Sequence, residues 1–296
     1  MVKSKKSDEV SNLVDKAEEF YSKGDLENAL KFYEEAVAIE PKNNTLYRGI
    51  ANISLDLGNF EKAIFACEEA LKINPKDIIS LLITGNLYLK KLDYKKALKY
   101  YQEAVKIDSK NIDCWFNLGE FYRIQEKYEE AIKNFKEAEN IDPKDVEILF
   151  KIAELADILS DFDLAMIYYT KIIKIWPEAS MIWARLSDLY YERGDYNKSK
   201  NCLLKLLKLE PENLQTLNNL GFLHIKLREY EKAKEYLEKA ITINPEEDIA
   251  WCTMAELYEA QDDLETAKKH FEKTLSLNPN NKTANDGLSR IKKKIN

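Results

Sequence analysis

Few residues in this chain have the types and spacing that catalysis or metal binding requires. The two histidines, His224 and His270, lie near no cysteine in a ligand pattern, so the sequence predicts no zinc site. We expect His224 to pack in a helix interface and His270 to be solvated. Phosphate-binding loops of the GxxxxGK(S/T) or GxGxxG type are absent from the sequence. The sequence therefore predicts neither an enzyme nor a bound cofactor.

The cysteines also show no pattern that points to chemistry. They are far apart, have no paired spacing, and are predicted to be free thiols: Cys67, Cys114, Cys202 and Cys252. The start of the chain, MVKSKKSDEV, is charged and unlike a secretory signal, so we expect a cytoplasmic protein. No apolar run reaches the roughly 18–20 residues of a membrane span. A sequence pI near 5.3 argues against a broad nucleic-acid-binding surface.

All seven prolines occupy one phase of a 34-residue period. The step from Pro41 to Pro75 is 34 residues, and the same step recurs except for one interval of 68 with Ser109 at its middle. Small residues recur at the eighth and twentieth positions, such as Gly119 and Ala131. Apolar residues at three- and four-residue steps predict two amphipathic helices of about 13 residues in each repeat. Eight repeats are predicted: 10–43, 44–77, 78–111, 112–145, 146–179, 180–213, 214–247 and 248–281.

These positions resemble the tetratricopeptide repeat family. The fourth repeat matches its signature at Trp115, Leu118, Gly119, Tyr122, Ala131, Phe135, Ala138 and Pro143. The resemblance covers residues 10–281 and implies an all-α, right-handed superhelical solenoid of stacked helix-turn-helix repeats. Residues 1–9 are then predicted to be a basic tail, and residues 282–296 a capping helix with a basic tail. Local departures predict altered packing at Ser54, Ser109, Ala156, Ile172 and Leu206.

The resemblance implies a concave groove lined by the first helix of each repeat. Its second, fifth, ninth, twelfth and thirteenth positions hold four bases (Arg48, Lys90, Arg123, Lys226) and eleven acids (Glu18, Asp56, Asp113, Glu120, Glu147, Glu154, Asp157, Asp188, Glu192, Glu256, Glu259). Adding the sixth position brings in Asp15, Lys151 and Arg185. Acids among apolar residues suit a basic, amphipathic segment of a partner protein. The predicted peptide-binding residues are Phe116, Glu120, Arg123, Phe150, Glu154, Asp157, Asp188, Tyr191 and Asn218.

Other readings of the groove stay open. Its acids could serve only solubility, and Asn218 and Asn219 could bind a peptide backbone or be merely solvated. Members of the family that bind chaperone C-terminal tails use bases and asparagines at set positions. Arg48 and Asn52 match the first pair, but Ile83 and Asp113 replace the next asparagine and base, so this activity is not expected.

Three further classes of function remain as alternatives. The chain could be a regulatory subunit of an enzyme complex whose catalysis lies on another chain. It could also be a self-assembling structural protein that stacks end to end. An RNA-binding helical repeat would need a basic, base-reading groove, which this sequence lacks. The partner, the pathway and the oligomeric state are not specified by the sequence.

Overall fold

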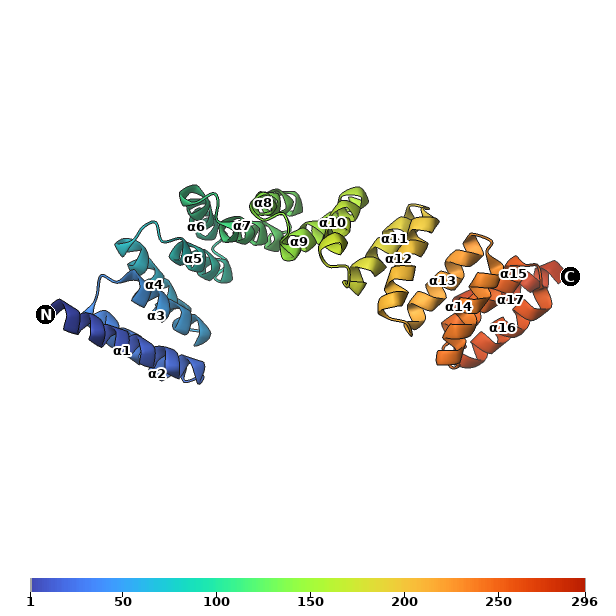
Figure 1. Ribbon diagram of the computed structural model, residues 1–296, viewed down its shortest axis with the longest axis horizontal. Coiled ribbons are helices and arrows are strands. Elements are labelled where there is room, and N and C mark those ends of the chain that lie inside the picture. Colours follow the sequence, from blue (N-terminus) through green and yellow to red (C-terminus); the bar gives the residue numbers. More distant parts are fainter. Residues whose placement is uncertain (1, 296) are drawn as a thin grey trace. The chain divides into compact units, whose positions relative to one another are not determined.

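The protein was analysed as a computed structural model that describes residues 2–295. All elements in that range are helices, and Figure 1 shows them following one another in chain order. The chain forms two compact parts, an N-terminal part ending at Leu155 and a C-terminal part beginning at Ala156. The helices that begin in the N-terminal part are α1 (Val2–Ser22), α2 (Leu26–Ile39), α3 (Asn44–Asp56), α4 (Phe60–Ile73), α5 (Ile78–Lys90), α6 (Tyr94–Ile107), α7 (Ile112–Ile124), α8 (Tyr128–Ile141) and α9 (Val146–Ile158). Those of the C-terminal part are α10 (Phe162–Ile175), α11 (Ser180–Glu192), α12 (Tyr196–Leu209), α13 (Leu214–Lys226), α14 (Tyr230–Ile243), α15 (Asp248–Ala260), α16 (Leu264–Leu277) and α17 (Lys282–Ile295).

Each predicted repeat contains one pair of these helices, which confirms an all-α solenoid of stacked helix-turn-helix units. Residues 2–9 differ from the expectation, because they form the beginning of α1 and not a separate tail. This stretch holds no glycine or proline that would end a helix. The first residue of the predicted tail lies outside the described residues.

The turn inside every repeat has the same backbone geometry at the fifteenth position. Glycine takes the left-handed conformation there in three repeats, for example Gly194 with φ of 80°. Five repeats place a residue with a side chain in the same conformation: Leu92, Glu126, Ser160, Arg228 and Asp262, with φ between 58° and 63°. Stacking of the helices therefore fixes this turn even where the local residue disfavours it by about 1–2 kcal/mol.

The small eighth position makes room for the large twenty-fourth position of the same repeat. A Cβ atom on Gly119 would lie 2.7 Å from the ring of Phe135, and one on Gly221 would lie 2.6 Å from the side chain of Leu237. Phe135 and Leu237 are fully buried. Close approach of the two helices thus requires a small residue on one and a large residue on the other.

The last helix, α17, covers the end of the eighth repeat. Ala284 and Ile291 are buried against a cluster that includes Cys252 and Phe271, while the lysines at 292–294 are exposed. Arg290 binds Glu259 of α15 with an Nη2–Oε2 distance of 2.7 Å. The helix therefore has the features of a cap, with an apolar inner face and a charged outer face.

Candidate functional site

In the N-terminal part, Glu120 of α7 lies between two cations. Its Oε2 atom accepts a hydrogen bond from Arg123 Nη2 at 2.7 Å, and its Oε1 atom lies 3.2 Å from Nζ of Lys151 on α9. Burial alone would raise the pKa of this carboxyl, but the hydrogen bond from Arg123 and the charge of Lys151 hold it below its ordinary value. Two predicted site residues, Glu120 and Arg123, thus lie together and neutralise each other.

Three other predicted residues of this part have separate surroundings. Phe116 is half-buried and packs edge-to-face on Phe135 of α8, with ring centroids 5.5 Å apart. Phe150 is also half-buried, on α9. Glu154 is exposed and forms no ion pair within residues 2–295. Of these three, Phe116 contributes mainly to the packing of α7 on α8.

Asp157, at the end of α9, belongs to the C-terminal part, and both of its carboxylate oxygens accept hydrogen bonds. Its Oδ2 atom accepts hydrogen bonds from Arg185 Nε at 2.8 Å and from the Tyr169 hydroxyl at 2.8 Å, and its Oδ1 atom accepts from Arg185 Nη2 at 3.1 Å. Arg185 and Lys151 both come from the sixth position of a first helix. That position therefore supplies the cations that neutralise Asp157 and Glu120, and the count of acids overstates the free negative charge.

The C-terminal part contains a hollow between α11, α12 and α13, here called the α11–α13 pocket. It consists of two adjacent cavities of about 350 and 200 Å³ that share Asp188, Leu203 and Asn219. The larger cavity is lined also by Ser180, Met181, Ala184, Leu206, Glu210, Asn213, Gln215 and Thr216, and the smaller by Ser187, Tyr191, Ser199, Phe222 and Leu223. The pocket thus combines an apolar floor from α12 with polar groups from the two first helices.

Asp188 differs from Glu120 in having no cationic partner among the described residues. Asp188 is exposed to solvent, but partial desolvation of its carboxyl still raises the pKa; Arg185 opposes this increase and the nearby Glu192 adds to it. Arg185 does not neutralise it, because its guanidinium group is bound to Asp157. Asp188 is therefore an acid in a pocket whose counter-ion the protein does not supply.

The structure places Asp188 and Tyr191 together in the pocket, but the asparagine that lines the pocket is not the predicted one. Asn219 lines both cavities, whereas Asn218 lines neither and has a buried Oδ1 atom without a hydrogen-bond partner. Sequence reasoning did not predict the floor residues Leu203 and Leu206. The sequence did contain a sign of this floor at Leu206, because Leu206 is a large residue at a position where the repeat pattern has a small one.

The two histidines have packing surroundings. His224 is 2% exposed, stacks on Tyr236 and places Nδ1 2.7 Å from Glu229 Oε2, as predicted for a helix interface. The prediction of a solvated His270 is wrong. Its ring stacks on Tyr258 and Trp251, with centroid distances of 5.3 and 5.5 Å, because both aromatic residues of α15 face α16 there.

The cysteines and acids of the described chain offer no reactive or metal-binding cluster. Burial raises the pKa of Cys67 and Cys252 to about 12 and that of Cys114 and Cys202 to about 11, so these free thiols stay protonated near neutral pH. Within residues 2–295, no group of three or more His, Cys, Asp or Glu side chains could hold a metal ion.

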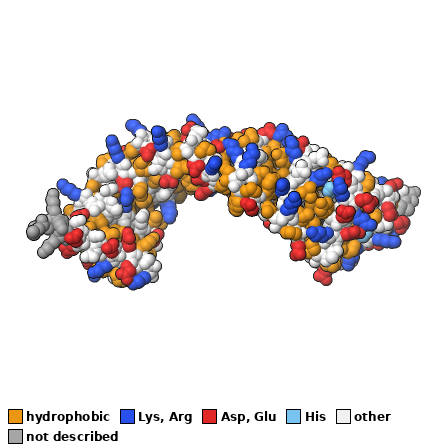
Figure 2. All heavy atoms as spheres, viewed as in Figure 1, with side chains coloured by type: hydrophobic (Ala, Val, Ile, Leu, Met, Phe, Trp, Pro, Cys, Tyr) orange, Lys and Arg blue, Asp and Glu red, His pale blue; other side chains and the backbone are white. Residues whose placement is uncertain are grey.

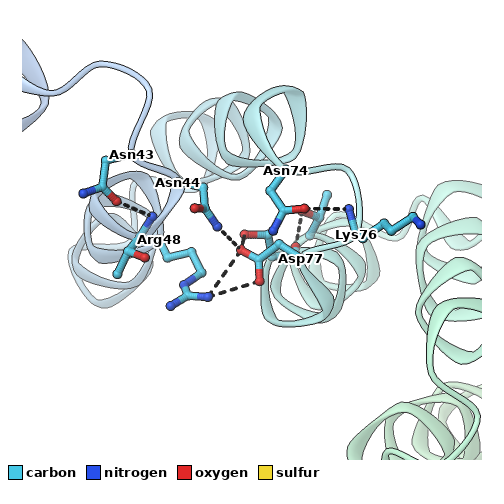
Figure 3. A network of polar contacts seen from close by, with 9 residues as sticks. Asn43, Asn44, Arg48, Asn74, Lys76 and Asp77 are labelled. Carbon is cyan, nitrogen blue, oxygen red and sulfur yellow. Dashed lines mark hydrogen bonds and ion pairs between the residues drawn. The ribbon is translucent and has the colours of Figure 1, made fainter.

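Arg48, the one base that matched a carboxylate clamp, is engaged inside the protein. Its Nη1 atom lies 3.1 Å from Oδ1 of Asp77, whose Oδ2 atom also accepts hydrogen bonds from Asn44 and Ser80 (Figure 3). Asp77 is only 8% exposed. Burial raises the pKa of this carboxyl, but the hydrogen bonds and Arg48 outweigh burial and lower it. Arg48 therefore links α3 to Asp77, the residue that precedes α5, and its charge is already paired.

Models of one protein family match most of the sequence. Models described as tetratricopeptide repeat match residues 20–82, 125–180, 180–213, 215–247 and 249–281. The chain belongs to the tetratricopeptide repeat family. A further model, described as anaphase-promoting complex, cyclosome, subunit 3, matches residues 56–138. No curated protein matches the sequence significantly.

Solved structures of other tetratricopeptide repeat proteins share the fold. The C-terminal part of one from Cytophaga hutchinsonii is 17% identical, with a TM-score of 0.60 over 93% of this chain and 99% of that one. One from Parabacteroides merdae is 19% identical, with a TM-score of 0.52 over 96% and 99%. YrrB, described as having an unusual peptide-binding site, is 22% identical, with a TM-score of 0.50 over 64% and 97%.

The surface of these tetratricopeptide repeats carries both signs of charge. On the face shown in Figure 2, acidic and basic side chains are interspersed among apolar ones. Within the described residues, none of the helices has both the length and the apolarity that crossing a bilayer needs. The α11–α13 pocket is therefore set apart by its unpaired acid and apolar floor, and not by the total charge of the surface.

Proposed function

We propose that this chain is a non-catalytic interaction scaffold that binds a basic, amphipathic segment of a partner protein on its first helices. The α11–α13 pocket is the main contact in this proposal. Tetratricopeptide repeat proteins in general are scaffolds for protein–protein interaction, and YrrB is described as having a peptide-binding site. A cytoplasmic location stays a prediction from the sequence.

The unpaired carboxylate of Asp188 carries the proposal. An exposed acid that lines a pocket and forms no ion pair with the described residues attracts a ligand that brings its own positive charge. Leu203, Leu206 and Ala184 line the same hollow and offer apolar surface to a side chain. The larger cavity, of about 350 Å³, falls in the size range of roughly 300–1,000 Å³ that is typical of ligand sites.

Residues of the N-terminal part contribute less to this proposal. Glu120 is neutralised internally, and Phe116 packs on α8. Glu154 and Phe150 remain proposed contacts on α9. We propose no nucleic-acid or membrane partner, because two of the four groove bases, Arg48 and Arg123, are held by acids.

A peptide pair of opposite charge tests this function. The basic peptide acetyl-(Arg-Leu-Ala)4-amide should bind the protein in fluorescence anisotropy, whereas acetyl-(Glu-Leu-Ala)4-amide should not. Added salt should weaken binding, mainly by slowing association. Asp188→Lys should reduce affinity at least tenfold, a loss of about 1.4 kcal/mol or more.

Glu235→Lys provides the matched control for this variant. Glu235 is exposed on α14, a second helix, and lines neither cavity of the pocket. Its reversal changes the net charge by the same amount and should leave affinity within about twofold. Equal binding of both peptides, or equal losses in the two variants, would refute the proposed function.

The alternative of end-to-end self-assembly has less support. The outer face of α17 carries lysines at 292–294, and its apolar residues Ala284 and Ile291 are buried inward. A regulatory role beside a catalytic chain is compatible with the same pocket, because the enzyme's segment would then be the ligand. The regulatory alternative therefore reduces to the question of what the first helices bind.

A further inference from the structure

We propose that the smaller cavity of the α11–α13 pocket is a subsite for one arginine side chain of the bound segment. This inference rests on the proposed function and specifies its ligand. The cavity is lined by Asp188 and Tyr191 of α11, by Asn219 and Phe222 of α13, and by Leu203 of α12. A carboxylate, an amide and aromatic rings around an apolar wall match the chemistry of a guanidinium group on an aliphatic stem.

The polar groups deepest in this cavity do not need a ligand. The hydroxyl groups of Ser187 and Ser199 hydrogen-bond to each other at 2.8 Å, and both residues are buried. Asp188 and Asn219 have no hydrogen-bond partner in the part of the chain that the structure describes. The groups left for a ligand are thus a negative acceptor and an amide, which complement the several N–H donors of a guanidinium.

Aromatic side chains favour arginine over lysine at this site. The rings of Tyr191 and Phe222 have centroids 6.0 Å apart, and Tyr196 lies 5.5 Å from Tyr191. A planar, weakly hydrated guanidinium stacks on such rings, whereas a lysine ammonium is more strongly hydrated. Lys226 already lies over the Phe222 ring at 4.9 Å, so Tyr191 is the ring that we assign to the ligand.

The other charged residues near the cavity leave Asp188 available to a ligand. Arg185, which acts on Asp188 electrostatically, is held by Asp157 at 2.8 Å. Glu192 is exposed on the same helix as Asp188 and lines neither cavity of the pocket. An anionic side chain would therefore be repelled by Asp188, and a neutral one would leave Asp188 without a counter-ion.

Methyl NMR with single amino-acid probes tests the subsite without knowledge of the partner. N-acetyl-arginine methylamide should shift the methyl signals of Leu203 and Leu223 saturably, with a dissociation constant in the millimolar range, since one side chain makes few contacts. The lysine analogue should bind several-fold more weakly and the neutral citrulline analogue at least tenfold more weakly. The methyl signals of Leu81, in the N-terminal part, should not move.

Two variants that each remove one negative charge separate specific from general attraction. Asp188→Asn should weaken binding of the arginine probe about tenfold, and Glu192→Gln should change it less than twofold. Tyr191→Leu should remove the preference for arginine over lysine while leaving a preference for cations. Equal binding of arginine and citrulline probes, or equal effects of Asp188→Asn and Glu192→Gln, would overturn the subsite.

The outcomes distinguish this inference from the proposed function. If the basic peptide binds and loses affinity in Asp188→Lys, but its citrulline version binds equally well, segment binding stands and the arginine subsite is refuted. If the arginine probe binds in the cavity but neither charged peptide does, the subsite stands and segment binding is refuted.

Discussion

Glu120 and Asp188 occupy the same place in two repeats, the ninth position of the first helix, and have opposite electrostatic surroundings. Glu120 lies between Arg123 and Lys151, and its pKa is lowered. Asp188 is exposed and forms no ion pair with the described residues, and partial desolvation of its carboxyl raises the pKa. The same residue class at the same repeat position is therefore a structural ion pair in one region and a candidate ligand group in the other.

Two neighbouring positions explain this difference. The cations around Glu120 come from the twelfth position of its own helix and the sixth position of the next first helix. For Asp188 those positions are Tyr191 and Asn219, which both line the pocket. For these two acids, the rule is that bases at these positions pair the carboxylate, whereas the absence of both leaves it available to a ligand.

The largest expected effect comes from giving Asp188 the cationic surroundings that Glu120 has. Tyr191→Arg combined with Asn219→Lys should supply Asp188 with two cations and reduce affinity for the basic peptide more than tenfold. Fluorescence anisotropy measures the loss. Tyr191→Leu with Asn219→Ala removes the same side chains without adding charge and should cost less, so an equal loss would contradict the rule.

The reverse conversion should destabilise the N-terminal part. Arg123→Tyr combined with Lys151→Asn leaves the half-buried Glu120 without a counter-ion, which we expect to cost about 1–2 kcal/mol of unfolding free energy. Urea unfolding followed by circular dichroism measures this cost. Adding Glu120→Gln to the double variant should restore part of the stability, and no restoration would argue against an unpaired charge as the cause.

Neutralising each acid alone should affect stability unequally. Glu120→Gln removes one side of an ion pair and should lower the unfolding free energy by about 1 kcal/mol. Asp188→Asn removes a charge that the fold disfavours, so stability should be unchanged or slightly raised. Thermal unfolding of both variants checks this difference, and a clear loss for Asp188→Asn would mean that its carboxylate has an internal partner.

The smallest effect is the dependence of these differences on pH. The pKa of Glu120 is lowered on folding, so its contribution is present above about pH 4.3, the ordinary value for glutamate, and is lost as pH falls through its folded value. The pKa of Asp188 is raised, so the folded state is penalised near neutral pH and the penalty disappears below about pH 3.9. We therefore expect the stability difference between each variant and the parent, measured by unfolding, to be smaller at pH 3.5 than at pH 7. The difference should have one sign for the Glu120 variant and the opposite sign for the Asp188 variant.

Sequence periodicity was sufficient to predict the helices and their stacking. Proline and the small eighth and twentieth positions recur in phase, and local packing follows from them, as between Gly119 and Phe135. The repeat did not reveal that Leu92 would adopt φ of 61°, because the stacked helices impose that turn on whatever residue is present. His270 was misjudged since its two aromatic neighbours lie on another helix.

The site was only partly predictable for a related reason. Position within the repeat placed Asp188 and Tyr191 on the groove side of α11, but it gave equal weight to Glu120 and Asp157, which are neutralised from another helix. It also favoured Asn218 over its neighbour Asn219. Both differences depend on contacts between helices, and these contacts cannot be inferred from residue positions along a single helix.

Calorimetric titration of the basic peptide into Asp188→Asn and Glu120→Gln tests the central claim most directly. Each variant removes one carboxylate from the ninth position of a first helix, so their net charges are equal. Our account predicts an affinity loss of about tenfold for Asp188→Asn and less than twofold for Glu120→Gln. Equal losses, or a larger loss for Glu120→Gln, would contradict the claim that the unpaired acid of the α11–α13 pocket binds the partner's positive charge.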